Sequence, residues 1–172
     1  MSNVVSEAIE IFNDLKDVIM IGAVAVMLHT KKTRMSFDVD VAVAGEITDE
    51  FMISKGYIPI QGRRDSWDTP RHGKVDLFRE DVSGIPIQTI IKTAVDLPAN
   101  SKNIVKVACV EAIIVSKYRA FNSQYRPNDK ADLQTIARRK FKEIDWNMVK
   151  KLTKNQLEYD EIKKAMTSFQ RF

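Results

Sequence analysis

Three aspartates in strand-like surroundings are the residues of this chain best suited to chemistry. Asp38 and Asp40 lie two apart in the alternating segment SFDVDVAVAG, so a β-strand would place both carboxylates on one face. Asp76 lies in a second short strand pattern, KVDLF. If the two strands are neighbours, three carboxylates converge. Such groups repel one another unless a cation or water lies among them.

Three interpretations of Asp38 and Asp40 remain open at this point. Their strand could lie at the edge of a sheet with one face in water. The two carboxylates could share a proton as an acid–base pair. They could also hold a divalent cation, because Mg²⁺ is typically bound through one or two carboxylates together with substrate phosphates.

Gly22 marks a second feature with chemical meaning. The apolar strand pattern DVIMIG ends at this glycine, and AVAVMLH continues as a helix pattern. Backbone N–H groups at the start of a helix bind anions, and glycine lets the backbone approach a ligand closely. Together with the three aspartates, this junction predicts a nucleoside triphosphate site for metal-assisted phosphoryl transfer.

The surrounding patterns predict the elements that must position these residues. Strands and helices alternate early in the chain, and helices dominate later. Helices are expected over 4–15, 23–29, 51–56, 85–95, 110–122, 128–140, 145–152 and 159–169, and strands over 17–22, 36–45, 57–62, 74–80 and 103–109. The polar stretch 63–73 is expected to be an irregular connection or a hairpin. The predicted fold is α/β (α+β), a small mixed β-sheet flanked by helices. A core over residues 1–84 carries a helical C-terminal part over residues 85–172, and the two form one compact domain.

Composition limits the class of protein and its partners. The chain of 172 residues is 44% hydrophobic and 29% charged, and no apolar run approaches the ~20 residues of a membrane span. The acidic, amphipathic N-terminus lacks the layout of a signal peptide, so a cytoplasmic protein without a membrane partner is expected. The lone Cys109 lies in an apolar run and is expected to be a buried, inert thiol.

Charge is divided unevenly along the chain. Residues 1–100 have a net charge of −4, and residues 101–172 have a net charge of +8, with 16 Lys and Arg against 8 Asp and Glu. A basic half suits a polyanion such as nucleic acid, although solvated helix faces explain the same asymmetry. Charge alone leaves both interpretations open.

A series of motifs over residues 18–137 carries a family resemblance. The segment from Ile21 reads I-G-A-x-A-x-x-x-H-(x4)-R-(x3)-D-x-D, and it is followed by KVDLF, EAIIVSKYRA and RPNDKADL in that order. The series resembles the DNA polymerase β-type nucleotidyltransferase superfamily. Within it, the chain is similar to the small, minimal AbiEii-like members of toxin–antitoxin and defence systems.

The resemblance implies a nucleotidyltransferase that moves a nucleoside monophosphate from an NTP, such as ATP, to a hydroxyl group. RNA, for example tRNA, or a protein would be the acceptor, and a cognate antitoxin or toxin would be a partner. The implied catalytic and metal-binding residues are Asp38, Asp40 and Asp76, which would hold two Mg²⁺ ions, with Asp76 also helping to deprotonate the hydroxyl. The implied nucleotide-binding residues are Gly22, Ala23, Arg34, Lys117 and Lys130.

The sequence departs from the family pattern at three places. Ala23 stands where the family usually has Gly or Ser, and alanine has no hydroxyl to donate to phosphates. The segment HTKKTR is one residue longer than usual, and the order D-K-A-D-L leaves the pairing of Lys130 with Asp132 open. A second hypothesis is therefore kept, a catalytically silent domain that binds nucleotide or a partner protein. His29 is expected to be a hydrogen-bonded core histidine, not a ligand.

Overall fold

A seven-stranded mixed sheet is the centre of the structure, a computed structural model that describes residues 3–171. The strand order is β3-β4-β5-β2-β1-β9-β8. The strands are β1 (Val18–Met20), β2 (Asp38–Val43), β3 (Ile58–Pro59), β4 (Ser66–Asp68), β5 (Lys74–Phe78), β8 (Val95–Pro98) and β9 (Ile104–Val107). A separate two-stranded hairpin consists of β6 (Asp81–Val82) and β7 (Ile85–Pro86).

Strand β2 lies in the middle of this sheet. It pairs with β5 in parallel and with β1 antiparallel. Val39 and Val41 on one face of β2 are fully buried, whereas Asp38 and Asp40 on the other face are partly exposed. The expectation that this strand could lie at the edge of a sheet is therefore wrong, although the face that carries Asp38 and Asp40 is partly open to solvent.

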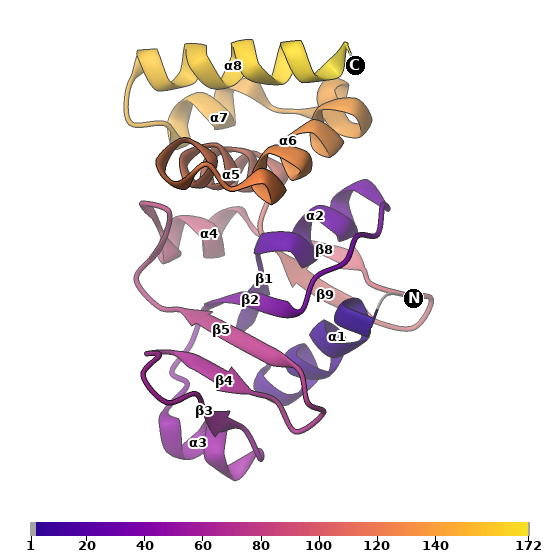
Figure 1. Cartoon of the computed structure of the whole chain (residues 1–172), viewed down its shortest axis with the longest axis vertical. Helices are drawn as coiled ribbons and strands as arrows, with labels where there is room; N and C mark the ends of the chain where they lie inside the picture. Colours follow the sequence, from indigo (N-terminus) through magenta and orange to yellow (C-terminus); the bar gives the residue numbers. More distant parts are fainter. Residues whose placement is uncertain (1–2, 172) are drawn as a thin grey trace.

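The helices form layers on the sheet, as Figure 1 shows. The helix α2 lies between the sheet and the pair α5 and α6, and α7 and α8 form the outermost layer. The short α3 lies beyond the edge strand β3 at the opposite end. The helices are α1 (Asn3–Leu15), α2 (Gly22–Thr30), α3 (Asp49–Ser54), α4 (Ile87–Thr93), α5 (Val110–Gln124), α6 (Pro127–Lys140), α7 (Trp146–Leu152) and α8 (Gln156–Gln170).

Local sequence explains where several helices begin. Pro127 opens α6, where a missing backbone N–H costs nothing. The Thr48 side chain accepts a hydrogen bond from the N–H of Phe51 and caps α3. Asp145 and Asn155 cap α7 and α8 in the same way. These signals set the helix starts without help from the tertiary structure.

The predicted mixed α/β architecture with flanking helices is confirmed, but the sheet extends past residue 85. Strands β8 and β9 belong to the main sheet, so the helical part begins with Val110. The strand β8 was not predicted, because its side chains are mostly exposed and its sequence, VDLP, contains proline. Its partner, β9, pairs in parallel with β1 through Val107 and Met20, a contact between distant segments that local patterns do not reveal.

The core confirms two smaller predictions. Cys109 is buried, and burial raises the pKa of its thiol, so the protonated, inert form is favoured. The Nε2 atom of His29 bonds to the carbonyl of Ala108 at 2.8 Å, which fixes α2 to the chain just after β9. Among the helices of residues 3–171, none has the length and apolar composition needed to cross a membrane.

Candidate active site

A cleft of about 550 Å³ lies between the sheet and helices α5 and α6. We call it the aspartate cleft. The segment 34–37 forms one wall, and Ala23 and Phe78 lie beside the acidic residues. The charged and polar residues that line it are Arg34, Ser36, Asp38, Asp40, Asp76, Lys117, Arg126, Asn128 and Asp129.

Strand register brings the three predicted aspartates together. Asp40 and Asp76 are direct partners on the parallel strands β2 and β5, and Asp38 lies on the same face of β2. Burial raises the pKa of Asp40, and the neighbouring charges of Asp76 and Asp38 raise it further, while Lys117 opposes them. The charged form of Asp40 is therefore disfavoured, and an added cation would stabilise it.

Lys74 forms ion pairs with two of the three aspartates. Its Nζ atom lies 2.8 Å from Asp76 Oδ2 and 3.5 Å from Asp38 Oδ2. Burial acts to lower the pKa of Lys74, but the hydrogen bond and charge of Asp76 raise it above the usual value, so the ammonium stays charged. The hydroxyl of Ser66 donates to the other oxygen, Asp76 Oδ1. Across residues 3–171, no hydrogen bond or ion pair reaches the carboxylate of Asp40.

Gly22 lies directly behind Asp40. Its φ is +60°, and a Cβ atom at this position would stand 2.0 Å from Asp40 Oδ2. The N–H of Ile21 donates to the backbone carbonyl of Asp40 at 3.0 Å, which ties the start of α2 to β2. Only glycine satisfies both the backbone conformation and the space. The first turn of α2 thus begins beside the carboxylates, and Ala23 faces the cleft.

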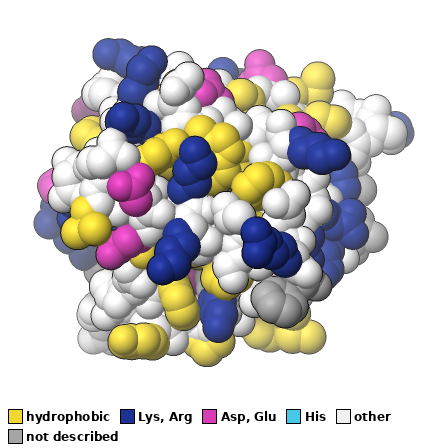
Figure 2. All heavy atoms as spheres, turned by 90° about the horizontal axis from the view of Figure 1, so that it is seen from above, with side chains coloured by type: hydrophobic (Ala, Val, Ile, Leu, Met, Phe, Trp, Pro, Cys, Tyr) yellow, Lys and Arg dark blue, Asp and Glu magenta, His cyan; other side chains and the backbone are white. Residues whose placement is uncertain are grey.

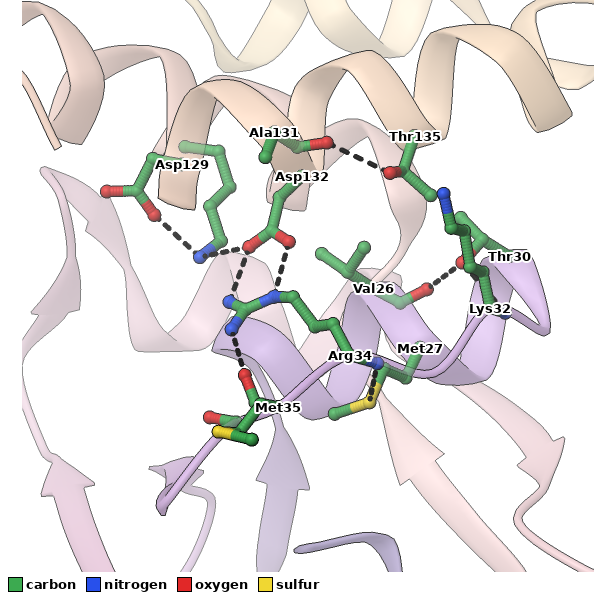
Figure 3. Close-up of polar contacts among 12 residues, drawn as sticks. Val26, Met27, Thr30, Lys32, Arg34, Met35, Asp129, Ala131, Asp132 and Thr135 are labelled. Atoms are coloured by element: carbon green, nitrogen blue, oxygen red, sulfur yellow. Dashed lines mark hydrogen bonds and ion pairs between the residues drawn. The ribbon is translucent and has the colours of Figure 1, made fainter. Parts of the chain in front are cut away.

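A network of ion pairs forms the roof of the aspartate cleft. Figure 3 shows Arg34, from the segment after α2, and Asp132, from α6, pointing toward one another. Arg34 Nε lies 2.7 Å from Asp132 Oδ1, and its terminal nitrogen lies 2.9 Å from Oδ2. The buried Lys117 of α5 lies 2.9 Å from Asp132 and 2.7 Å from Asp129. Arg126 Nε completes the chain at 3.3 Å from Asp129 Oδ2.

Two solved structures resemble this chain over nearly all of its length. A candidate nucleotidyltransferase from H. pylori superimposes with a TM-score of 0.54 at 14% identity, covering 99% of this chain and 96% of that one. JHP933 from Helicobacter pylori superimposes with a TM-score of 0.55 at 15% identity, covering 99% and 94%. The chain has the nucleotidyltransferase fold. No protein-family model and no curated protein matches the sequence.

Within the nucleotidyltransferase fold, most of the predicted site residues lie together. Those that line the aspartate cleft are Ala23, Arg34, Asp38, Asp40, Asp76 and Lys117, and Gly22 supports Asp40 from behind. Lys130 does not line the cleft, and its ammonium lies over the ring of Phe121, 5.9 Å from the centroid. Asp132 pairs with Arg34 and Lys117, which answers the question of whether it pairs with Lys130.

Sequence reasoning missed three residues of this site as individual contributors, namely Lys74, Ser66 and Arg126. Lys74 had a readable signal, because it precedes Asp76 by two positions in a strand and must share its face. Ser66 had no such signal, because its strand, β4, was not predicted and lay within the polar connection 63–73. Arg126 was noted only as part of the motif RPNDKADL.

The donor chemistry of the aspartate cleft fits a divalent cation. Carboxylate oxygens are the ligands that Mg²⁺ prefers, and within residues 3–171 no ion pair reaches either oxygen of Asp40 or the Oδ1 atom of Asp38. However, no three His, Cys, Asp or Glu side chains in the described part of the chain are close enough to form a three-ligand metal site. The cleft therefore offers Asp38 and Asp40 as metal ligands, whereas the third carboxylate, Asp76, is bound to Ser66 and Lys74.

Proposed function

We propose that this protein is a nucleotidyltransferase that moves a nucleoside monophosphate from an NTP to an acceptor hydroxyl. The observation that carries this proposal is the register of Asp40 with Asp76 beside the first turn of α2. One location thus combines carboxylates for cations with a helix start for phosphates. The fold shared with the two H. pylori structures supports the same conclusion.

The proposed reaction is a displacement at the α-phosphorus. The acceptor oxygen forms a bond to this phosphorus as the bond to the bridging oxygen of the β-phosphate breaks, and pyrophosphate leaves. The proton of the hydroxyl passes to a carboxylate of the cleft. Asp76 is the candidate, because Ser66 and Lys74 hold it in place. Positioning and charge stabilisation account for most of the rate in such transfers.

The cleft residues have distinct roles in this proposal. Asp38 and Asp40 would hold a divalent cation, Mg²⁺, which would neutralise phosphate charge when bound. Arg126 and Arg34 lie where negatively charged phosphates would enter. Lys117, whose ammonium is already shared between Asp129 and Asp132, acts mainly by holding the roof in place.

RNA is the acceptor that the charge distribution favours. Figure 2 views the molecule onto its helical end, where Lys and Arg side chains are spread across the face among apolar ones. Residues 101–172 carry 16 Lys and Arg against 8 Asp and Glu. Such a surface attracts a phosphate backbone without reading its sequence. An AbiEii-like role in a toxin–antitoxin pair, with tRNA as acceptor, is part of this proposal.

Transfer of label from each α-labelled NTP, with Mg²⁺, to total RNA and to total cell protein tests the proposal. We expect label on RNA that disappears in the double variant Asp38→Ala/Asp40→Ala. The matched control is Asp96→Ala/Asp160→Ala, which removes two exposed aspartates far from the cleft and should keep the activity. Label on protein instead of RNA would keep the reaction and change the acceptor.

A catalytically silent domain that binds nucleotide or a partner protein is the second candidate. It is favoured by Ala23, which cannot donate a hydroxyl hydrogen bond, and by the two ion pairs that already engage Lys117. This candidate predicts no label on either acceptor, weak Mg²⁺-dependent NTP binding and unchanged biological activity in Asp38→Ala.

A further inference from the structure

We propose that the aspartate cleft holds one divalent cation, between Asp38 and Asp40, and that the ammonium of Lys74 takes the place of a second. The inference rests on the proposed function only in taking the cleft to bind a cation with its nucleotide. In this arrangement Asp76 binds Lys74 and Ser66 instead of a metal ion.

Both oxygens of Asp76 already have protein partners. Ser66 donates to Oδ1, and Lys74 Nζ lies 2.8 Å from Oδ2. Each oxygen therefore keeps a lone pair, but a metal ion bound at Oδ2 would lie beside the ammonium that donates to the same oxygen, and the two cations would repel each other. The lack of a three-ligand cluster among residues 3–171 agrees with this arrangement.

Asp40 and Asp38 are in the opposite situation. The carboxylate of Asp40 has no hydrogen bond or ion pair within the described residues, and Asp38 meets Lys74 through Oδ2 alone, at 3.5 Å. Both side chains leave the same face of β2. With Asp40 ionised, these three carboxylates and the ammonium of Lys74 have a formal charge of −2, which a single divalent ion would neutralise. The next cation that acts on Asp40, Lys117, is already paired with Asp129 and Asp132.

Strand pairing fixes the position of Lys74. It is the register partner of Asp38 on the neighbouring strand β5, and its side chain is only 17% exposed. Pairing with β2 and β4 fixes the backbone of Lys74, so its ammonium stays within reach of Asp38 and Asp76. A second divalent cation between Asp38 and Asp76 would have to displace it and then face its repulsion at short range.

Counting bound Mn²⁺ by electron paramagnetic resonance tests the inference directly. The full-length chain is titrated with Mn²⁺ in the presence of a non-hydrolysable ATP analogue. We expect one ion per chain, a loss of affinity of about tenfold or more in Asp40→Asn, and a change of less than about threefold in Asp76→Asn. In Lys74→Met we expect a second ion, because Asp38 and Asp76 are then free to bind it.

Lys106→Met is the matched control. Lys106 also projects from a strand and lies 3.5 Å from a strand aspartate, Asp96, but away from the cleft. It should leave the count at one. Two ions or none on the unmodified chain, or an equal loss of affinity in Asp76→Asn and Asp40→Asn, would overturn the inference. The ion count on the unmodified chain and the affinities of Asp40→Asn and Asp76→Asn test the inference even if Lys74→Met does not fold.

The count separates this inference from the proposed function. One bound ion without transfer of label would leave the inference standing and refute the function. Transfer of label by a chain that binds two ions would refute the inference and leave the proposed function standing.

Discussion

Arg34 holds both carboxylate oxygens of Asp132, 98 residues further along the chain, at 2.7 and 2.9 Å. The pair joins the segment that leads into β2 to the helix α6, so the aspartate strand and the helical part form two sides of one cleft. A two-pronged arginine–carboxylate contact fixes direction as well as distance. Lys117, which also pairs with Asp132, extends the same connection to α5.

Asp132→Asn should destabilise the protein strongly. Asp132 is buried and serves two cations, so its neutralisation leaves Arg34 and Lys117 short of a partner. Removing one member of a buried ion pair costs about 3–5 kcal/mol of unfolding free energy. Urea denaturation measures this change. The exposed Asp160→Asn is the control, with an expected change within about 0.5 kcal/mol, and equal effects of the two substitutions would refute the role given to Asp132.

Gly22→Ala should displace Asp40 and abolish transfer. The added Cβ would collide with Asp40 Oδ2, and the positive φ adds strain of about 1–3 kcal/mol. Gly62→Ala is a matched control, because Gly62 also has a positive φ, +76°, but no atom within 4 Å of a Cβ. Thermal unfolding should shift in both variants, whereas loss of label transfer is expected in Gly22→Ala alone. Retained activity in Gly22→Ala would show that the position of Asp40 is not critical.

Arg126→Met and Lys130→Met should differ in nucleotide binding. Both substitutions remove one positive charge near the start of α6, but only Arg126 lines the aspartate cleft. A lost charge-assisted contact of about 1.5–3 kcal/mol corresponds to roughly a tenfold or larger loss of NTP affinity in Arg126→Met. Calorimetric titration with a non-hydrolysable NTP should give an unchanged affinity for Lys130→Met. The opposite order would restore Lys130 as the nucleotide-binding residue.

Acidification should weaken the fold through His29. Burial lowers the pKa of His29 below its usual 6.5, so the unfolded chain binds the proton more readily than the folded one. The stability that the neutral imidazole contributes is full above about pH 6.5 and is lost as the pH falls from there toward the lower, folded-state pKa. Unfolding curves of the wild-type chain and of His29→Gln, measured from pH 7.5 to 5, should show the wild-type advantage shrinking.

The other histidine provides the comparison for this pH effect. His72 is exposed in a loop with a φ of +63°, and asparagine tolerates that conformation. His72→Asn should follow the wild-type dependence on pH. A wild-type advantage over His29→Gln that stays constant across the range would contradict the assignment.

The candidate carboxylates could be predicted from the sequence because their signals are local. A strand places residues two apart on one face, so Asp38 and Asp40 had to share their direction. The glycine between a strand and a helix pattern identified the start of α2 in the same way. Lys74, two positions before Asp76, carried the same kind of signal but was read only as part of a strand.

The partners of those carboxylates depended on contacts that no local pattern contains. Sequence alone determined that two aspartates share a face and that a helix begins at Gly22, since backbone geometry links neighbouring residues directly. Only the tertiary structure decided that β2 is central, that Asp40 faces Asp76, and that Lys117 and Arg34 bind Asp132. Strand order and ion pairing between distant segments depend on how the whole chain buries its apolar faces, and that is settled only when the chain folds as one.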